Sequence, residues 1–181
     1  MIRAVSSPEP ARRGFLKKIA AALLGGLATL VPVTSAFLVF LDPLRRKAQA
    51  GVFLKVATLP SLPEDGSPRK FPVLSTRSDA WNRAVNVPVG AVYLRRKEGD
   101  GVTAFNVVCP HLGCFVDYSP ARRDYLCPCH NSSFALDGSI SDPKSPSPRG
   151  LDELDVEIRD GDEIWVKFQN FQATKHEKIP V

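Results

Sequence analysis

Apolar residues follow two different patterns along this chain. Ile19–Leu41 is a run of 23 residues without a charged side chain, and as a helix it would be roughly 35 Å long, against a membrane hydrocarbon core of about 30 Å. From Phe71 onward, short runs rich in Val, Ile, Phe and Tyr alternate with turn residues, which is typical of β-strands. The sequence therefore predicts one transmembrane helix followed by an all-β domain. A buried core helix is the alternative for the first run.

Three Asp-Gly pairs, at residues 100–101, 137–138 and 160–161, have the composition of tight turns between strands. Around the last pair, apolar and polar residues alternate on both sides of the turn, as one buried face of an antiparallel hairpin requires. The apolar positions are Leu154, Val156, Ile158, Ile164, Val166 and Phe168. Because the chain shows neither an internal repeat nor a low-complexity tract, we predict a single antiparallel β-sandwich or barrel-like domain.

Composition divides the chain into four segments. Residues 1–18 are basic, and Arg12-Arg13 followed by Phe15-Leu16-Lys17 resembles the twin-arginine export signal, which predicts a cytoplasmic N-terminal region. Residues 19–41 are the predicted anchor, residues 42–70 a linker or hinge, and residues 71–181 the β domain. The linker prediction rests on three prolines within Leu59–Arg69 and would allow the domain to move; an ordered loop packed on the domain is the alternative.

The distribution of charge argues against nucleic acid and for a membrane. Residues 1–50 carry a net charge of +6, whereas residues 51–181 carry −1, so the predicted β domain lacks the basic surplus of a nucleic-acid binder. Ala48-Gln49-Ala50 has the pattern of a signal-peptidase site. The apolar run of 23 residues, however, is longer than the apolar region of a cleaved signal, which is usually about 7–15 residues. We therefore expect an uncleaved, single-pass protein of the inner membrane. The twin arginines predict a cytoplasmic N-terminus and a periplasmic β domain.

Cysteine and histidine are concentrated in two short loops. All four cysteines and two of the three histidines lie between residues 109 and 130, in the sequences Cys109-Pro110-His111-Leu112-Gly113-Cys114 and Cys127-Pro128-Cys129-His130-Asn131-Ser132. Each loop offers thiolate and imidazole ligands, and this mixture suits both iron–sulfur clusters and zinc. The residue types alone leave both metals open.

The spacing Cys-x-His, fifteen residues and then Cys-x-x-His resembles the Rieske proteins. This resemblance implies one Rieske-type [2Fe–2S] cluster per chain, with Cys109 and Cys127 on the inner iron and His111 and His130 on the outer iron. It also implies that Cys114 and Cys129 form a disulfide that clamps the loops, and that Ser132 donates a hydrogen bond to a bridging sulfide. A zinc-stabilised adhesion or assembly module is the alternative of a different class.

The anchor and the two additional cysteines are similar to the iron–sulfur subunits of cytochrome bc-type and b6f-type quinol:cytochrome c oxidoreductases. The resemblance implies an oxidoreductase subunit whose partners are quinol, a cytochrome b subunit, a c-type cytochrome and membrane lipid. His130 and His111 would be the catalytic residues, taking up protons as the cluster takes up electrons. The Ser145–Arg149 run looks like the proline-rich loop that covers the cluster in this group, with serine in place of its opening glycine.

One departure from that group predicts the quinol. Where relatives have Gly-Ser and then a tyrosine that donates a hydrogen bond to a cysteine sulfur, this chain has Asn131-Ser132 and Phe134. The missing hydroxyl predicts a lower reduction potential and therefore a low-potential quinol such as menaquinol. The alternative function is the Rieske small subunit of another exported oxidoreductase, such as arsenite oxidase.

Overall fold

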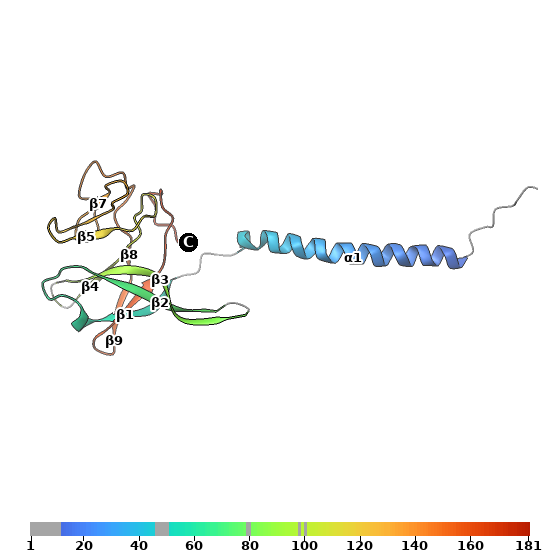
Figure 1. Ribbon diagram of the computed structural model, residues 1–181, viewed down its shortest axis with the longest axis horizontal. Helices are drawn as coiled ribbons and strands as arrows, with labels where there is room; N and C mark the ends of the chain where they lie inside the picture. The colour runs from blue at the N-terminus through green and yellow to red at the C-terminus, as the bar shows by residue number, and fades with distance from the viewer. Residues whose placement is uncertain (1–11, 46–50, 79–80, 98, 100) are drawn as a thin grey trace, which may run out of the picture. The chain divides into compact units, whose positions relative to one another are not determined.

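The computed structural model describes residues 12–45, 51–78, 81–97, 99 and 101–181 and divides into two units, Met1–Lys47 and Ala48–Val181. The described residues of the first unit form one helix, α1 (Arg12–Arg45), which contains the whole predicted span (Figure 1). Its segment Gly14–Asp42 is long and apolar enough to cross a membrane, and none of its most apolar stretch is buried within the structure. The predicted helix is thus confirmed, and a buried core helix is not what the structure shows.

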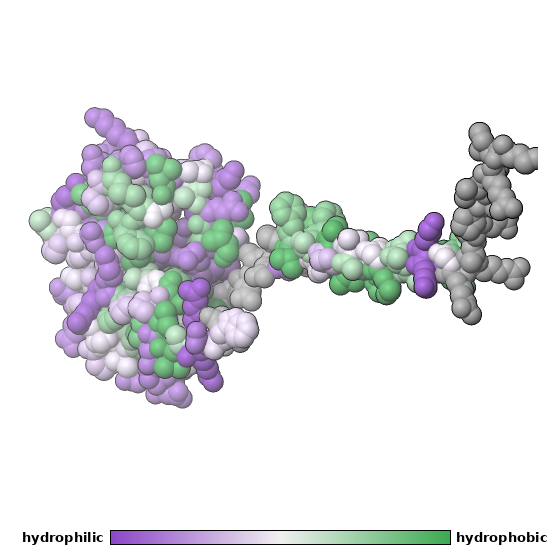
Figure 2. Space-filling model, turned by 45° about the vertical axis from the view of Figure 1, so that its right-hand side comes forward, coloured by the Kyte–Doolittle hydropathy of each residue, from purple (hydrophilic) through white to green (hydrophobic). Residues whose placement is uncertain are grey.

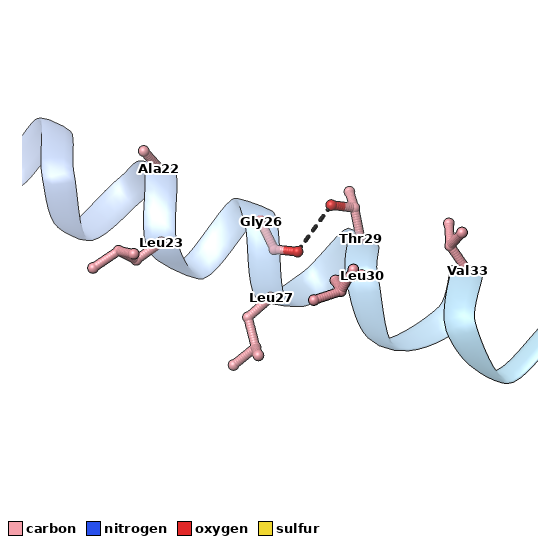
Figure 3. Close-up of a pocket in the computed structure, with 7 residues that line it drawn as sticks. All are labelled: Ala22, Leu23, Gly26, Leu27, Thr29, Leu30 and Val33. Carbon is pink, nitrogen blue, oxygen red and sulfur yellow. Dashed lines mark hydrogen bonds between the residues drawn. The ribbon is translucent and has the colours of Figure 1, made fainter.

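The surface of α1 is mostly apolar (Figure 2), and its few hydroxyls bond within the helix itself. Thr29 donates to the carbonyl of Gly26 at 3.0 Å (Figure 3) and to that of Gly25 at 3.0 Å. Thr34 donates to the carbonyl of Leu30 at 2.8 Å. Pro32 lies inside α1 without ending it. Such internal bonds satisfy polar groups that lipid could not satisfy. The export-signal prediction remains a prediction, and the signal-peptidase-like pattern at residues 48–50, which we expect to stay uncleaved, lies outside the described residues.

The described residues of the second unit form three antiparallel sheets (Figure 1). The first has the order β1-β10-β9 (Val52–Thr58, Glu163–Phe168, Val156–Arg159), and the second has the order β2-β3-β4-β8 (Arg69–Ser78, Arg83–Arg96, Val102–Asn106, Glu153–Leu154). The third, β5-β6-β7 (Asp117–Ser119, Asp124–Leu126, Ser133–Phe134), carries the second cysteine loop between β6 and β7. The predicted all-β domain is confirmed.

The β3–β4 pair separates two hydrophobic cores. Tyr93 pairs with Phe105 and Leu94 pairs with Ala104, and successive side chains on a strand point to opposite faces. Tyr93 and Phe105 accordingly join the core that contains the two loop thiols, whereas Leu94 and Ala104 join the core shared with the first sheet. Both faces of this pair are therefore buried. The face that carries Tyr93 and Phe105 packs against the core around the loop thiols and so attaches the cysteine loops to the second sheet.

Two of the three predicted turns lie within the described residues. At the second, Gly138 has a φ of 83° and its N–H donates to the Ala135 carbonyl at 2.9 Å. The last hairpin turns over residues 160–162 between the paired Arg159 and Glu163, and φ is 50° at Asp160 and 86° at Gly161. The strands β3 and β4 pair up to Arg96 and Val102, but Asp100 of the first predicted turn lies outside the described residues. Of the six alternating positions, Ile164 and Val166 are fully buried, but Ile158 is 40% exposed. The reason is its place on β9, an edge strand of the sheet order β1-β10-β9.

Residues 51–70 do not form the predicted linker, and this part of the prediction is wrong. Val52 to Thr58 pair with β10 as β1, a 3-10 turn at Leu59–Ser61 follows, and Leu62 is 3% exposed in the core. Proline fits the first positions of such a turn, so the proline content did not indicate an open connector. The rest of the predicted hinge, residues 46–50, lies outside the described residues.

Candidate metal centre

The two cysteine loops have the same backbone hydrogen bonds. In the first loop, the Cys109 N–H donates to the Cys114 carbonyl at 2.7 Å and the Gly113 N–H donates to the Cys109 carbonyl at 2.9 Å. In the second, the Cys127 N–H donates to the Ser132 carbonyl at 2.8 Å and the Asn131 N–H donates to the Cys127 carbonyl at 3.1 Å. Each loop thus closes between its first and sixth residues.

This geometry explains why asparagine follows the last histidine. The fifth residue of each loop has a positive φ, 80° at Gly113 and 58° at Asn131. Glycine adopts this region without penalty, and asparagine is among the residues that tolerate it best. Asn131 therefore gives the second loop the shape that Gly113 gives the first, a requirement that the sequence alone did not reveal.

The two loops are joined by a disulfide between Cys114 and Cys129, as the resemblance predicted. The sulfur atoms of this pair and of Cys127 all lie within 4.8 Å of one another. Because the paired sulfurs are already bonded to each other, these three cysteines do not form a ligand set. The disulfide instead lies directly against the second free thiol and holds the loops together around it.

The remaining thiols and imidazoles converge from the two loops. Cys109 and Cys127 are unpaired and buried, at 0% and 1% exposure. His111 is half-buried and His130 is exposed, and their rings lie edge to face with centroids 4.8 Å apart. The site thus has an inner side made of sulfur and an outer side made of imidazole, and the solvent reaches only the outer side.

Several polar atoms here have no partner among the described residues. Burial raises the pKa of the Cys109 thiol, and the His111 backbone N–H and the Ser132 hydroxyl beside it oppose this rise. The Ser132 hydroxyl is buried but makes no hydrogen bond of normal geometry, and Nδ1 of His111 is likewise buried and unpartnered. Polar atoms buried in this way are costly unless they bind something. Two free thiols, an orphaned ring nitrogen and an orphaned hydroxyl fit a [2Fe–2S] cluster, because thiolate and imidazole are its ligands and sulfide accepts hydrogen bonds.

The other predicted residues lie as follows. Phe134 is fully buried in the core that also contains Cys109 and Cys127. The proline-rich run Ser145–Pro148 forms an irregular loop, and the next side chain, Arg149, binds the C-terminal segment rather than either histidine. Tyr93, which the sequence did not single out, accepts the Tyr118 N–H at 2.9 Å and so joins β3 to β5 beneath the loops.

Comparisons with known proteins agree with this geometry. The family model described as Rieske [2Fe-2S] domain matches residues 55–157. The cytochrome b6-f complex iron-sulfur subunit of Chlorobaculum thiosulfatiphilum is 31% identical over 157 residues, which cover 86% of this chain and 74% of that protein. The menaquinol:cytochrome c reductase iron-sulfur subunit of Geobacillus thermodenitrificans is 29% identical over 123 residues, 66% of this chain and 70% of that protein.

Among solved structures, the plasma membrane Rieske protein of Synechocystis PCC 6803 matches with 23% identity and a TM-score of 0.43, over 65% of this chain and 99% of that one.

Proposed function

Since the chain belongs to the Rieske [2Fe–2S] family, and so carries a Rieske-type cluster, we propose that it is the electron-transfer subunit of a menaquinol:cytochrome c oxidoreductase. The observation that carries the proposal is the convergence of two buried thiols and two imidazoles from loops joined by a disulfide. The names of the relatives support the class of complex. In that complex its partners are a cytochrome b subunit, a c-type cytochrome, quinol and lipid.

We assign the cluster ligands to the four unbonded side chains of the two loops. Cys109 and Cys127 hold the inner iron because they are the buried thiols, and His111 and His130 hold the outer iron because they lie on the solvent side. Nδ1 of His111 is the ring nitrogen that faces the interior without a partner. Ser132 then supplies a hydroxyl donor to the sulfur atoms.

The cluster, when bound, supplies a one-electron acceptor whose potential is raised because two neutral imidazoles replace two thiolates. The chain supplies the path for the proton. His130 is exposed, so its outer ring nitrogen accepts a hydrogen bond from a quinol hydroxyl and then takes its proton. His111 is the second such group, and the cysteines of the inner side are buried away from water.

Phe134 supports menaquinol as the donor. It occupies a fully buried position in the core around the thiols, where a phenyl ring offers no hydroxyl to the sulfur ligands. One fewer donor stabilises the reduced state less and lowers the potential. Two of the relatives carry menaquinol in their names.

The chain is a single-pass membrane protein with α1 as its anchor. We propose that its N-terminus is cytoplasmic and its β domain periplasmic, because the twin arginines precede the helix. The disulfide supports this side of the membrane, since such bonds persist outside the reducing cytoplasm.

Electron paramagnetic resonance of the reduced protein in its native membrane tests the ligand assignment. We expect the spectrum of a histidine-ligated [2Fe–2S] cluster, which disappears in His111→Ala and His130→Ala. His176→Ala is the matched control because the side chain of this third histidine is exposed and belongs to neither cysteine loop. A zinc-containing protein with no spectrum would refute the assignment.

The complex itself is tested by what co-purifies with the chain and by its substrates. We expect b-type haem, and a spectrum that changes when a quinol-site inhibitor is added. Molybdopterin instead of b-type haem would favour the arsenite oxidase alternative. Faster reduction of a c-type cytochrome by ubiquinol than by menaquinol would refute the choice of quinol.

A further inference from the structure

The C-terminal segment, residues 169–181, returns from β10 to the first cysteine loop. It folds on itself, with the Gln172 N–H donating to the Ile179 carbonyl at 2.9 Å and the Val181 N–H donating to the Asn170 carbonyl at 3.1 Å. From this folded segment, the Thr174 N–H donates to the Pro110 carbonyl at 2.8 Å. Pro110 stands between the two ligands proposed for the first loop and is fully buried. The segment is therefore a strap over that loop, and we use this name for it below.

Arg149 holds the strap on both sides of Thr174. Its Nη1 donates to the Lys175 carbonyl at 2.5 Å, and its Nη2 donates to the Gln172 carbonyl at 3.1 Å. The same guanidinium makes two parallel bonds to Asp152, from Nε at 2.9 Å and from Nη2 at 2.8 Å. The two side chains are only 11% and 6% exposed. A bidentate, shielded pair of this kind fixes the direction of the remaining donors.

Asn106 ties the beginning of the strap to the strand that leads into the first loop. This last residue of β4 is 1% exposed. Its side-chain amide donates to the Gln169 carbonyl at 2.9 Å and to Oδ1 of Asn170 at 3.0 Å, while its own Oδ1 accepts the Val108 N–H at 3.0 Å. One side chain thus joins both segments, and the strap is fixed at its start, by Asn106, and near its middle, by Arg149.

We propose that the strap and Arg149 set the position of the first cysteine loop, and that Arg149 is a positioning residue for its cluster ligands. This inference rests on the proposed assignment of Cys109 and His111. Arg149 touches neither of them and acts through Lys175 and Gln172 on the Thr174 N–H. The Pro110 carbonyl belongs to the peptide bond between Pro110 and His111. A movement of the strap therefore also moves the His111 imidazole relative to the Cys109 thiol. Partners outside the ligand shell commonly change metal affinity by about 10–100-fold.

Two pairs of variants in the full-length protein, in its native membrane, test the proposal. Thr174→Pro removes the donated N–H and also displaces the strap there, because proline cannot adopt the φ of 65° found at this position. Thr174→Gly keeps the N–H and accepts that φ. Arg149→Lys keeps the charge beside Asp152 but loses the planar fork, and its control is Arg159→Lys, at an exposed arginine paired with Glu157 on the edge strand.

The readouts are iron release to a chelator, the resonance spectrum and the midpoint potential. Thr174→Pro and Arg149→Lys should release iron about tenfold faster, with an altered spectrum and a shifted potential. Thr174→Gly and Arg159→Lys should match the unmodified protein in all three. If Thr174→Pro and Arg149→Lys keep the original spectrum and potential, the proposal is overturned, even where thermal stability falls. An unmodified protein without the histidine-ligated spectrum would instead overturn the proposed function on which the inference rests.

Discussion

Replacing Ser132 with alanine should change the stability of the cluster-free chain and the potential of the cluster in opposite directions. Ser132 is 0% exposed, and its hydroxyl makes no hydrogen bond with the described residues. An unpaired buried hydroxyl costs roughly 1–3 kcal/mol. Ser132→Ala removes that cost together with a single oxygen atom, so we expect the cluster-free protein to become more stable by about 1 kcal/mol.

On the proposed assignment, the same hydroxyl would donate to a sulfur of the bound cluster, and such a bond would be stronger when the cluster carries the extra electron. A difference of about 1 kcal/mol between the two redox states corresponds to roughly 40 mV for one electron, because a tenfold change in equilibrium equals about 59 mV. Ser132→Ala should therefore lower the midpoint potential by about 40 mV on this conversion. The potential is measured by redox titration followed by electron paramagnetic resonance, and the stability by urea unfolding of the full chain in detergent.

Ser133→Ala is the matched control for this prediction. Ser133 is 2% exposed, and its hydroxyl is also buried without a partner among the described residues, but it is not among the groups that act on the Cys109 thiol. The Ser133→Ala substitution should stabilise the cluster-free protein to a similar degree and leave the midpoint potential of the cluster unchanged. Equal shifts of potential in both variants, or no shift in Ser132→Ala, would refute the assignment of the Ser132 hydroxyl to the cluster.

Three further substitutions test the packing and the clamp. Gly138→Ala should destabilise the domain by about 2–5 kcal/mol, because φ is 83° and an added Cβ would lie 2.4 Å from the Phe105 ring; an unchanged thermal midpoint would contradict this. Replacing Cys114 and Cys129 with serine should cost about 3 kcal/mol in urea unfolding, since the bond closes a loop with a sequence separation of 15, and equal stability under oxidising and reducing conditions in the unmodified protein would speak against it. Phe134→Tyr should raise the midpoint potential by about 40 mV if the new hydroxyl reaches a ligand sulfur, and a redox titration without an upward shift would disprove the explanation of the low potential.

The metal centre was predictable because its information is local. Residues 109–114 and 127–132 each carry their ligands within six positions, and the disulfide between them follows from the resemblance that these loops carry. The hairpin at Asp160-Gly161 was predictable for the same reason, since alternation and turn composition occur together within a few residues.

The features that were missed depend on partners far away in the sequence. The strand β1 pairs with β10, more than a hundred residues later, as in Val52 with Phe168, and its burial does not alternate strictly. The strap donates to Pro110 from a backbone N–H, and a backbone hydrogen bond leaves no side-chain pattern in the sequence. Both were hidden because irregular or edge segments obtain their hydrogen bonds from tertiary neighbours rather than from their own periodicity.

The position of β3 and β4 between the two cores determines how the domain unfolds. Tyr93 and Leu94, adjacent along one strand, are embedded in different cores, so neither core can loosen without disturbing the backbone that supports the other. Heat or denaturant should therefore melt the redox end and the base of the domain as one cooperative unit. A partner protein that binds at the exposed imidazole side should therefore move the domain as one rigid body rather than deform the loops.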